Sequence, residues 1–302
     1  MGENELNRKI WRQFVFLFLI ILPLFFTLIV PLGRIFIDSF FQYDSLFNKH
    51  YVGFENYLHI FLDKQTFDFI CNSILLLVYV PLNAGIAFLL SGFLVDKKGF
   101  RWIKVIIYSP KIISIVVIGI VAQITFGLDG AANRFLLKLG LNSVYWFGNK
   151  YTALFIMVLC LVWINFGWQT IIFSSQLKSI PSNLIDLSVI DGLSFPRKLM
   201  TLYLPHLRKT ILYSSVLSIV FSFCSYYPLI KVLTNGGPGY STTTIDLYLY
   251  QNIRSGYRMA GQKCALIIVM LLLELLLILF VFILDILIQK LGIFFKMKYR
   301  GE

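Results

Sequence analysis

The sequence has little charge for its length, and that scarcity excludes most soluble folds. Only 14% of its 302 residues are charged, whereas 58% are hydrophobic. A soluble domain of this size could not cover so much apolar surface, because too few polar residues remain for its outside. A lipid bilayer is the solvent that fits this composition.

Cysteine and histidine are also scarce and scattered. The four cysteines lie far apart without a CxxC pair, and the three histidines are equally dispersed, so neither a disulfide framework nor a metal site is predicted. The apolar runs also contain no paired carboxylates, no HExxH and no Gly-x-Ser-x-Gly motif, which argues against a membrane-embedded glycosyl-transfer or protease-like enzyme. The chain is therefore not expected to be an enzyme.

The sequence has no complete phosphate-binding loop. Gly256 and Gly261 have the spacing of the two glycines in the Gly-x-x-x-x-Gly-Lys-Ser/Thr motif. However, Gln262 separates Gly261 from Lys263, and Cys264 stands where Ser or Thr is required. We therefore expect no ATP and no other cofactor on this chain. The net charge of +12 does not indicate nucleic-acid binding, because the basic residues lie between long apolar runs and form no patch.

Six apolar runs are long enough to cross about 30 Å of hydrocarbon. Backbone polar groups find no partners in lipid, so runs of this length must be helical. A cleaved signal peptide is a weaker reading of the first run, because the run is too long and no small-residue cleavage site follows it. The predicted helices are residues 14–37, 70–94, 103–127, 152–175, 211–233 and 264–288.

The distribution of basic residues predicts the orientation. The segments before the first run, between alternate runs and after the last run carry 16 basic residues, and the opposite segments carry 7. By the positive-inside rule the richer side is cytoplasmic, so both termini are expected in the cytoplasm. The 16 are Arg8, Lys9, Arg12, Lys97, Lys98, Arg101, Lys104, Lys178, Arg197, Lys198, Arg208, Lys209, Lys290, Lys296, Lys298 and Arg300; the 7 are Lys49, Lys64, Arg134, Lys138, Lys150, Arg254 and Arg258.

The cytoplasmic loop 177–210 has its own helical pattern. A short helix is expected from about Pro181, a break near Gly192, and a second short helix with Ser194 as its N-cap. Pro205 then marks the return to the membrane. The loop displays Asp186, Asp191, Arg197, Lys198 and an apolar stripe, which fits docking to a partner and a helix in the membrane interface about equally well.

This loop resembles the EAA loop of permeases from binding-protein-dependent ABC importers. The family pattern is Glu-Ala-Ala, two residues, Asp-Gly-Ala and a spacer that ends in Pro. Here it reads Asp186-Leu187-Ser188, Val189-Ile190, Asp191-Gly192-Leu193 and the spacer to Pro205. The shorter acid and the larger residues that replace alanine imply a slightly different fit to the partner.

Three further segments resemble the carbohydrate-uptake group of the same family, each on the predicted side of the membrane. The segment Val52–Tyr57, followed by Asn72-Ser73, is similar to its first outer loop. Tyr108-Ser109-Pro110 and Gly130–Asn133 are similar to its third helix and exit. Leu233–Pro238, with Thr242–Thr244 and Tyr248, is similar to the turn after its fifth helix.

The resemblance implies an all-α, polytopic membrane protein with the type I ABC importer permease fold, as one transmembrane domain over residues 1–302. It implies a bacterial cell-membrane location, a second homologous permease subunit, an ATPase dimer that binds ATP and Mg, and an extracytoplasmic solute-binding protein. The solute would be a sugar or an oligosaccharide-like molecule. The coupling residues would be Asp186, Asp191, Gly192, Arg197 and Pro205.

Polar and aromatic residues on the fourth and fifth predicted helices are candidates for the solute pathway. Sugars suit aromatic platforms with amide and hydroxyl partners, although ordinary helix packing explains any one of these residues equally simply. The candidates are Asn165, Trp168, Gln169, Ser225, Tyr226 and Tyr227.

A few charges fall within or beside the apolar runs. Arg34, Lys263 and Asp285 are expected to snorkel at helix ends. Lys231 and Glu274 would pair with each other, face the pathway or mark helix boundaries. Lys111 belongs to the same set. The alternative function is an ion-coupled secondary transporter, but only Glu274 is a clear intramembrane acid and no internal repeat is visible.

Overall fold

The computed structural model describes residues 2–45, 48–95, 100–252, 256 and 259–298, with side chains described for 11–45, 48–95, 102–252, 256 and 259–289. Of the basic residues used to predict the orientation, Lys97, Lys98, Arg254, Arg258 and Arg300 lie outside the described residues, and Arg8, Lys9, Arg101, Lys290, Lys296 and Lys298 have no described side chain.

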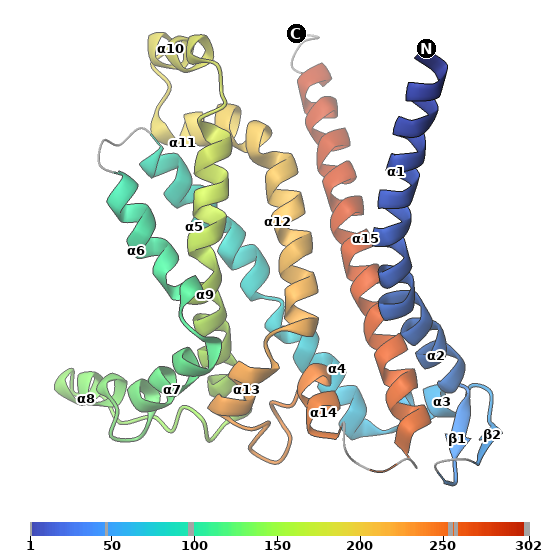
Figure 1. The fold of residues 1–302 in the computed structure, drawn as a ribbon. Helices are drawn as coiled ribbons and strands as arrows, with labels where there is room; N and C mark the ends of the chain where they lie inside the picture. The colour runs from blue at the N-terminus through green and yellow to red at the C-terminus, as the bar shows by residue number, and fades with distance from the viewer. Residues whose placement is uncertain (1, 46–47, 96–99, 253–255, 257–258, 299–302) are drawn as a thin grey trace. The chain divides into compact units, whose positions relative to one another are not determined.

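The regular secondary structure of the described chain is helical apart from one short β-hairpin (Figure 1). It contains six helical spans long and apolar enough to cross a membrane, which confirms the predicted fold class. These spans are Trp11–Asp38, Lys64–Leu94, Ile115–Lys138, Lys150–Leu177, Phe195–Cys224 and Ala260–Gln289.

The chain divides into two compact units, each described by itself below. The smaller unit comprises residues 1–63 and 254–272, and the larger comprises 64–253 and 273–302. Helix α15 (Ala260–Lys298) contributes to both.

The smaller unit begins with a long apolar helix that the described chain does not cover. It runs as α1 (Gly2–Leu24), a π-helical turn η1 (Phe25–Ile29) and α2 (Val30–Asp38), and no residue of its most apolar window is buried. Such a surface requires lipid or another chain around it.

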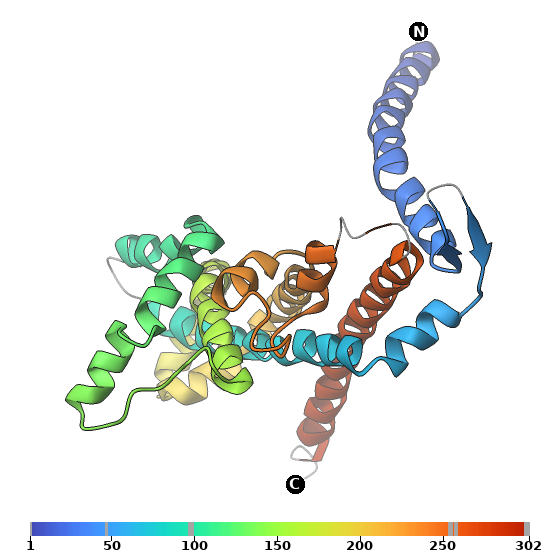
Figure 2. The ribbon, with the colours of Figure 1, turned by 90° about the horizontal axis from the view of Figure 1, so that it is seen from below.

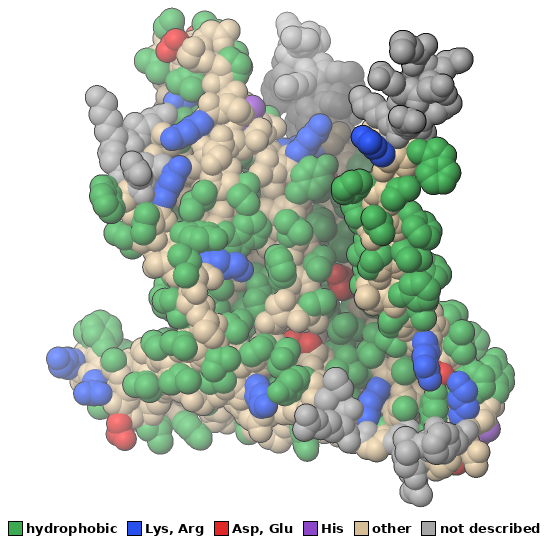
Figure 3. Space-filling model, viewed as in Figure 1, with side chains coloured by type: hydrophobic (Ala, Val, Ile, Leu, Met, Phe, Trp, Pro, Cys, Tyr) green, Lys and Arg blue, Asp and Glu red, His purple; other side chains and the backbone are tan. Residues whose placement is uncertain are grey.

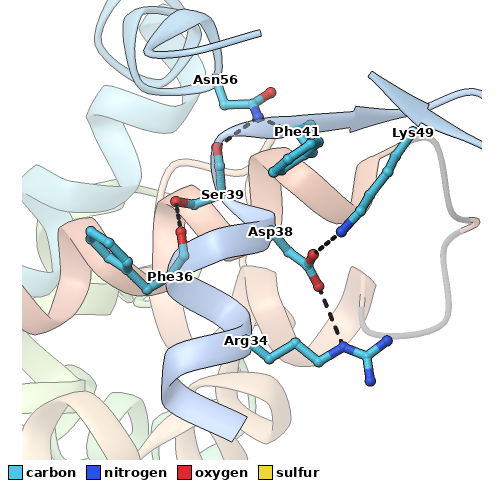
Figure 4. A network of polar contacts seen from close by, with 7 residues as sticks. All are labelled: Arg34, Phe36, Asp38, Ser39, Phe41, Lys49 and Asn56. Carbon is cyan, nitrogen blue, oxygen red and sulfur yellow. Dashed lines mark hydrogen bonds and ion pairs between the residues drawn. The ribbon is translucent and has the colours of Figure 1, made fainter. Parts of the chain in front are cut away.

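A hairpin and a short helix follow α2 in the smaller unit. Strands β1 (Phe41–Tyr43) and β2 (Lys49–Tyr51) pair antiparallel and precede α3 (Glu55–Leu62). Asp38 accepts a 2.8 Å hydrogen bond from Lys49 and lies 3.7 Å from Arg34, and the buried Asn56 amide donates to the carbonyls of Ser39 and Phe41 (Figure 4). These contacts tie the hairpin and α3 to the end of α2.

Gly261 belongs to this unit as well. A Cβ atom there would overlap the Phe41 carbonyl and approach the Asn56 amide. Close backbone packing therefore requires a glycine at this position. Packing thus accounts for Gly261, one of the two glycines in the incomplete phosphate-loop pattern.

The larger unit is built around α9 (Lys150–Leu177), which packs against α5 (Tyr79–Leu94), α6 (Phe100–Ile112) and α12 (Leu204–Cys224). Its other membrane helices are α4 (Lys64–Leu76), α7 (Ile115–Phe126) and residues 273–298 of α15. At one end lie α8 (Ala131–Lys138), α13 (Tyr227–Leu233) and α14 (Ile245–Asn252), and the loop 177–210 lies at the other (Figure 1).

The end with α8, α13 and α14 is held by side-chain amides. Buried Asn133 donates to the carbonyls of Gly127, Leu128 and Val144 and accepts from Trp146 Nε1. Helices α13 and α14 pack against each other, and α14 packs against α4 (Figure 2). Asn72 of α4 also binds the loop that precedes α14, because its side-chain amide donates to the carbonyls of Ser241 and Thr243 at 2.9 Å.

Three of the predicted membrane helices are interrupted. The run 70–94 breaks at Leu77–Val78, 103–127 breaks at Ile113–Ser114, and 211–233 breaks at Ser225–Tyr226. Apolar composition alone does not reveal such breaks. Apolar side chains are equally compatible with lipid and with protein neighbours, so a broken helix and a continuous one have the same composition.

Proline accounts for two of the interruptions. Pro81 cannot donate to the Leu77 carbonyl, which instead accepts a shorter-range bond from Val80. Pro228 stands in the first turn of α13, where a missing N–H costs nothing, and it cannot continue α12.

Candidate functional site

The loop 177–210, hereafter the elbow, contains two short helices joined by a tight turn. They are α10 (Ser182–Ile190) and α11 (Phe195–Lys198), with Pro181 and Ser194 at their N-cap positions. A π-helical turn η2 (Leu199–Tyr203) leads on into α12, whose first turn contains Pro205. The elbow thus connects α9 to α12 through α10, α11 and η2.

The turn after α10 depends on Gly192. Its φ is +62°, the left-handed conformation expected for it from the sequence. The Leu193 N–H donates to the Ser188 carbonyl and the Gly192 N–H donates to the Val189 carbonyl, both at 3.0 Å. This is a Schellman motif, which ends α10 sharply and reverses the chain.

Helix α10 presents apolar side chains to the outside. Val189 and Ile190 are 69% and 78% exposed, and Leu184 and Leu187 are also exposed. Figure 3 shows hydrophobic side chains beside acidic ones on the α10 projection. Because this chain leaves the stripe uncovered, another molecule must cover it in a stable assembly.

The charged residues predicted for coupling are exposed on the same elbow. The side chains of Asp186, Asp191 and Arg197 make no hydrogen bond or ion pair within the described residues. They are therefore free to bind a partner, and their coupling role stays a prediction.

The base of the elbow is packed rigidly onto the membrane helices. A buried apolar cluster joins it to α5, α9 and α12, and Gly92 of α5 lies so close to Leu199 that a Cβ atom would overlap it. The half-buried Ile185 of α10 also packs against this cluster. The cluster comprises Ala87, Phe88, Phe173, Leu177, Ile180, Leu199, Tyr203 and Leu207.

An ion pair lies close to the elbow end of α12. Arg208 Nε and Nη2 donate to the two carboxylate oxygens of Asp285 on α15 at 2.6 and 2.7 Å. Asp285, which was predicted to snorkel at a helix end, thus pairs with a cation from another helix. A bidentate pair of this kind fixes the two helices geometrically.

A second polar cluster lies deep among the membrane helices, and we call it the core network. Asn165 Oδ1 accepts from Lys111 Nζ at 2.9 Å and from the Tyr226 hydroxyl at 3.1 Å. Asn165 is 2% exposed, and its own amide donates to the Leu161 carbonyl. One buried amide therefore joins α6, α9 and the α12–α13 junction.

The network continues through hydroxyl groups. Tyr79 packs edge-to-face on Tyr226 with 5.8 Å between ring centroids, and it donates to the Ser218 carbonyl at 2.6 Å. Ser222 donates to the Tyr79 hydroxyl, and Gln169 Nε2 donates to Ser218 Oγ at 3.1 Å. Polar groups in a membrane interior normally satisfy one another in this way.

The structure brings only some of the predicted pathway residues together. Asn165, Gln169 and Tyr226 belong to the core network. Trp168 is half-buried, and its indole N–H has no partner among the described residues. Tyr227 instead stacks on Tyr250 of α14, and the half-buried Ser225 side chain has no hydrogen bond within the described residues.

Of the alternatives given for Lys231 and Glu274, pairing with each other is not observed in the described part of the chain. Lys231 Nζ lies 4.7 Å from the Tyr250 ring centroid, and neither residue forms an ion pair in the described part of the chain. Lys231 is therefore held by a cation–π contact on α13.

The family of this chain follows from comparison with known proteins. Residues 83–292 match the model of the inner membrane component of binding-protein-dependent transport systems, and this range contains the elbow and most of the core network. The chain belongs to this family.

Relatives of the permease support the assignment. It is 29% identical to a probable ABC transporter permease protein, YesP, of Bacillus subtilis (strain 168), with 80% of each chain covered. It is 28% identical to the sn-glycerol-3-phosphate transport system permease protein UgpA of Yersinia enterocolitica, covering 74% of this chain and 77% of that one. It is 30% identical to the arabinooligosaccharides transport system permease protein AraP of Bacillus subtilis (strain 168), covering 65% and 63%.

Solved structures share the fold of the permease. A bacterial ABC transporter involved in import of the acidic polysaccharide alginate superimposes with a TM-score of 0.78 at 20% identity, over 93% of this chain and 97% of that chain. The same kind of transporter, in complex with an alginate pentasaccharide-bound periplasmic protein, gives 0.79 over 92% and 94%. The predicted ABC importer permease fold is therefore confirmed.

Some members of the core network, Tyr79 and Ser218 among them, are absent from the sequence-based candidates. Tyr79 and Ser218 lie within apolar runs and belong to no motif with a characteristic spacing, so the neighbouring sequence does not identify them as site residues. Lys111 was visible as a cation inside an apolar run, but only the packing of α6 on α9 brings it to Asn165.

Proposed function

We propose that this permease imports a sugar or an oligosaccharide-like solute delivered by an extracytoplasmic binding protein. Support comes from relatives whose names specify arabinooligosaccharides and sn-glycerol 3-phosphate as transported solutes. The chain has no complete phosphate-binding loop, so a separate ATPase dimer would hydrolyse ATP with Mg.

The elbow carries this proposal, because its exposed stripe and unpaired charges suit a protein partner. The ATPase would grip α10 through the apolar stripe, with Asp186 and Arg197 forming ion pairs at its edge and Asp191 and Gly192 shaping the turn. The buried base of the elbow would then transmit motion to α5, α9 and α12. Pro205 would define where α12 resumes.

The proposal also includes the arrangement in the membrane. The elbow and both termini would face the cytoplasm, as the distribution of basic residues predicts. A second, homologous permease would complete a pathway of alternating access, with solute near the middle of the bilayer. Asn165, Gln169 and Tyr226 would form the part of that pathway contributed here, with Trp168, Ser225 and Tyr227 as further candidates.

A photo-crosslinking experiment tests the docking. Benzoylphenylalanine at Ile190, which is exposed on α10, should crosslink to the ATPase in membranes containing the full transporter. The matched control carries the same group at Leu139, which is also exposed but lies beside α8 at the opposite end of the larger unit. Crosslinking of Ile190 to lipid alone, or equal crosslinking from both positions, would contradict the proposal.

A further inference from the structure

Three interrupted membrane helices meet at the core network. Tyr79 follows the break between α4 and α5, Lys111 precedes the break between α6 and α7, and Tyr226 lies in the break between α12 and α13. In membranes, helix interruptions are tolerated where they are buried in protein or line a cavity, and transporters use them to build solute sites. The convergence of three breaks on one hydrogen-bonded cluster marks this region as more than packing.

The depth of the network follows from the length of α9. Asn165 lies 15 residues after Lys150 and 12 residues before Leu177. At 1.5 Å per residue these correspond to about 22 and 18 Å, so Asn165 is near the middle of the helix. The network is thus close to the centre of the bilayer, far from lipid phosphate groups.

Lys111 is a cation without an anion in this region. Its ammonium group has three donors, and within the described residues it makes one side-chain hydrogen bond, to Asn165, together with a cation–π contact 5.6 Å from the Phe221 ring centroid. Phe221 is exposed and Lys111 is half-buried, so the ammonium group lies at the accessible edge of the network.

The local structure offsets only part of the cost of this charge. A lysine at the centre of a membrane helix is costly to insert. Its position in the last turn of α6, where the helix dipole favours a cation, recovers a small part of that cost. Asn165 is neutral and also accepts from Tyr226, so it leaves the charge uncompensated.

We infer that Lys111 binds the anionic group of the transported solute, so that the permease imports an acidic saccharide or a sugar phosphate. This inference rests on the proposed function, because it names the solute class for the same pathway. Asn165 and Tyr226 orient the ammonium group, and Phe221 offers an apolar face for the sugar ring. A carboxylate and a phosphate share the chemistry that Lys111 recognises.

Transport measurements on the complete importer in proteoliposomes test the inference. Labelled probes are offered in matched pairs: glucuronate with glucose, a galacturonate trisaccharide with a galactose trisaccharide, and glycerol 3-phosphate with glycerol. We expect uptake of an anionic member at least roughly tenfold above its neutral partner, because the neutral member cannot form the charge-assisted hydrogen bond to Lys111. Uptake only of neutral members would overturn the inference.

Substitutions then connect the selectivity to this residue. Lys111→Met should reduce uptake of the anionic probe at least about tenfold, whereas Lys111→Arg should retain most of it, because Arg keeps the charge. Lys138→Met is the matched control, since it removes one cation from the exposed end of α8. Unchanged anion uptake in Lys111→Met, or an equal loss in Lys138→Met, would contradict the assignment.

Two further readings separate the possible failures. If Lys111→Met does not assemble, the charge selectivity of the wild-type importer still decides the question. The ligand of Lys111 could instead be the phosphate group of a phospholipid. In that case anionic lipid would bind to wild type but not to Lys111→Met, and solute uptake would show no charge selectivity. This outcome would overturn the inference. If no probe is taken up and the binding protein does not stimulate ATP hydrolysis, the proposed function itself is contradicted.

Discussion

Asp246 has an acidic group in surroundings that favour its neutral form. It lies in the first turn of α14, outside the spanning helices, and one carboxylate oxygen has no partner among the described residues. The other oxygen accepts from the Thr244 hydroxyl and from the Leu247 N–H. Burial outweighs these bonds and raises its pKa from 3.8 to about 6.

This residue predicts a pH dependence of stability. Well below pH 4 the carboxyl group is protonated in both the folded and the unfolded chain, so it adds no penalty. Between about pH 4 and 6 only the folded chain keeps the proton, so stability falls as pH rises and levels off above about pH 6. Asp246→Asn should therefore be more stable than wild type above pH 6, by roughly 3 kcal/mol given the shift from 3.8 to about 6, and this gap should shrink to well under about 1 kcal/mol near pH 4.

Thermal unfolding of purified wild type and variant between pH 4 and 8 measures this difference. Asp129→Asn is the control, because Asp129 is exposed in the loop before α8. A constant gap between the Asp246→Asn and wild-type midpoints across the whole range would show that the buried carboxyl group is not the cause.

At the scale of elements, the contact between α6 and α9 decides whether Lys111 reaches Asn165. Gly167 of α9 lies against the backbone of α6, and a Cβ atom there would overlap the Ile107 carbonyl. Backbone cannot move aside as a side chain can, so the two helices must separate if this position is filled.

Gly167→Ala should therefore destabilise the permease by about 1–3 kcal/mol and disrupt the hydrogen bond between Lys111 and Asn165. The thermal midpoint and the uptake rate should both fall. Gly85→Ala is a matched control on α5, because a Cβ atom at that helical glycine meets nothing within 4 Å. Equal effects of the two substitutions would argue against close packing as the reason for Gly167.

The elbow turn makes a separate prediction. Gly192→Ala adds a side chain into open space, so its only cost is the left-handed backbone, about 1–2 kcal/mol. Insertion should persist, whereas binding-protein-stimulated ATP hydrolysis should fall several-fold because α10 no longer holds its angle.

The control for this variant is Gly140→Ala. Gly140 follows α8, has a φ of +76° and also faces open space, so it carries the same backbone strain away from the elbow. Full ATPase stimulation in Gly192→Ala, or equal loss in Gly140→Ala, would remove the elbow turn from the coupling mechanism.

At the scale of the whole molecule, the source of energy distinguishes the proposed importer from an ion-coupled transporter. Glu274 is the membrane acid on which proton coupling would depend, and it has no ion pair in the described part of the chain. Uptake into proteoliposomes with ATP on the elbow side should persist when a protonophore collapses the proton gradient, and it should stop when ATP is replaced by a non-hydrolysable analogue. Loss of uptake with the protonophore at constant ATP would favour the ion-coupled alternative.

The sequence by itself determined the features that depend on local composition and spacing. The six apolar spans follow from the length of hydrocarbon to be crossed, and the elbow helices follow from Pro181, Gly192 and Ser194, whose backbone preferences act within a few residues. The family was also readable from the Asp-Gly turn and its distance to Pro205.

Only the tertiary structure decided which distant residues share a site. Asn165, Lys111, Tyr226 and Tyr79 come from four parts of the chain, and no spacing relates them. Their contact depends on how α6 and α12 pack on α9, through close approaches such as that at Gly167. Likewise, the sequence predicts that Asp285 snorkels at a helix end but does not show its pairing with Arg208, which lies 77 residues away in the chain.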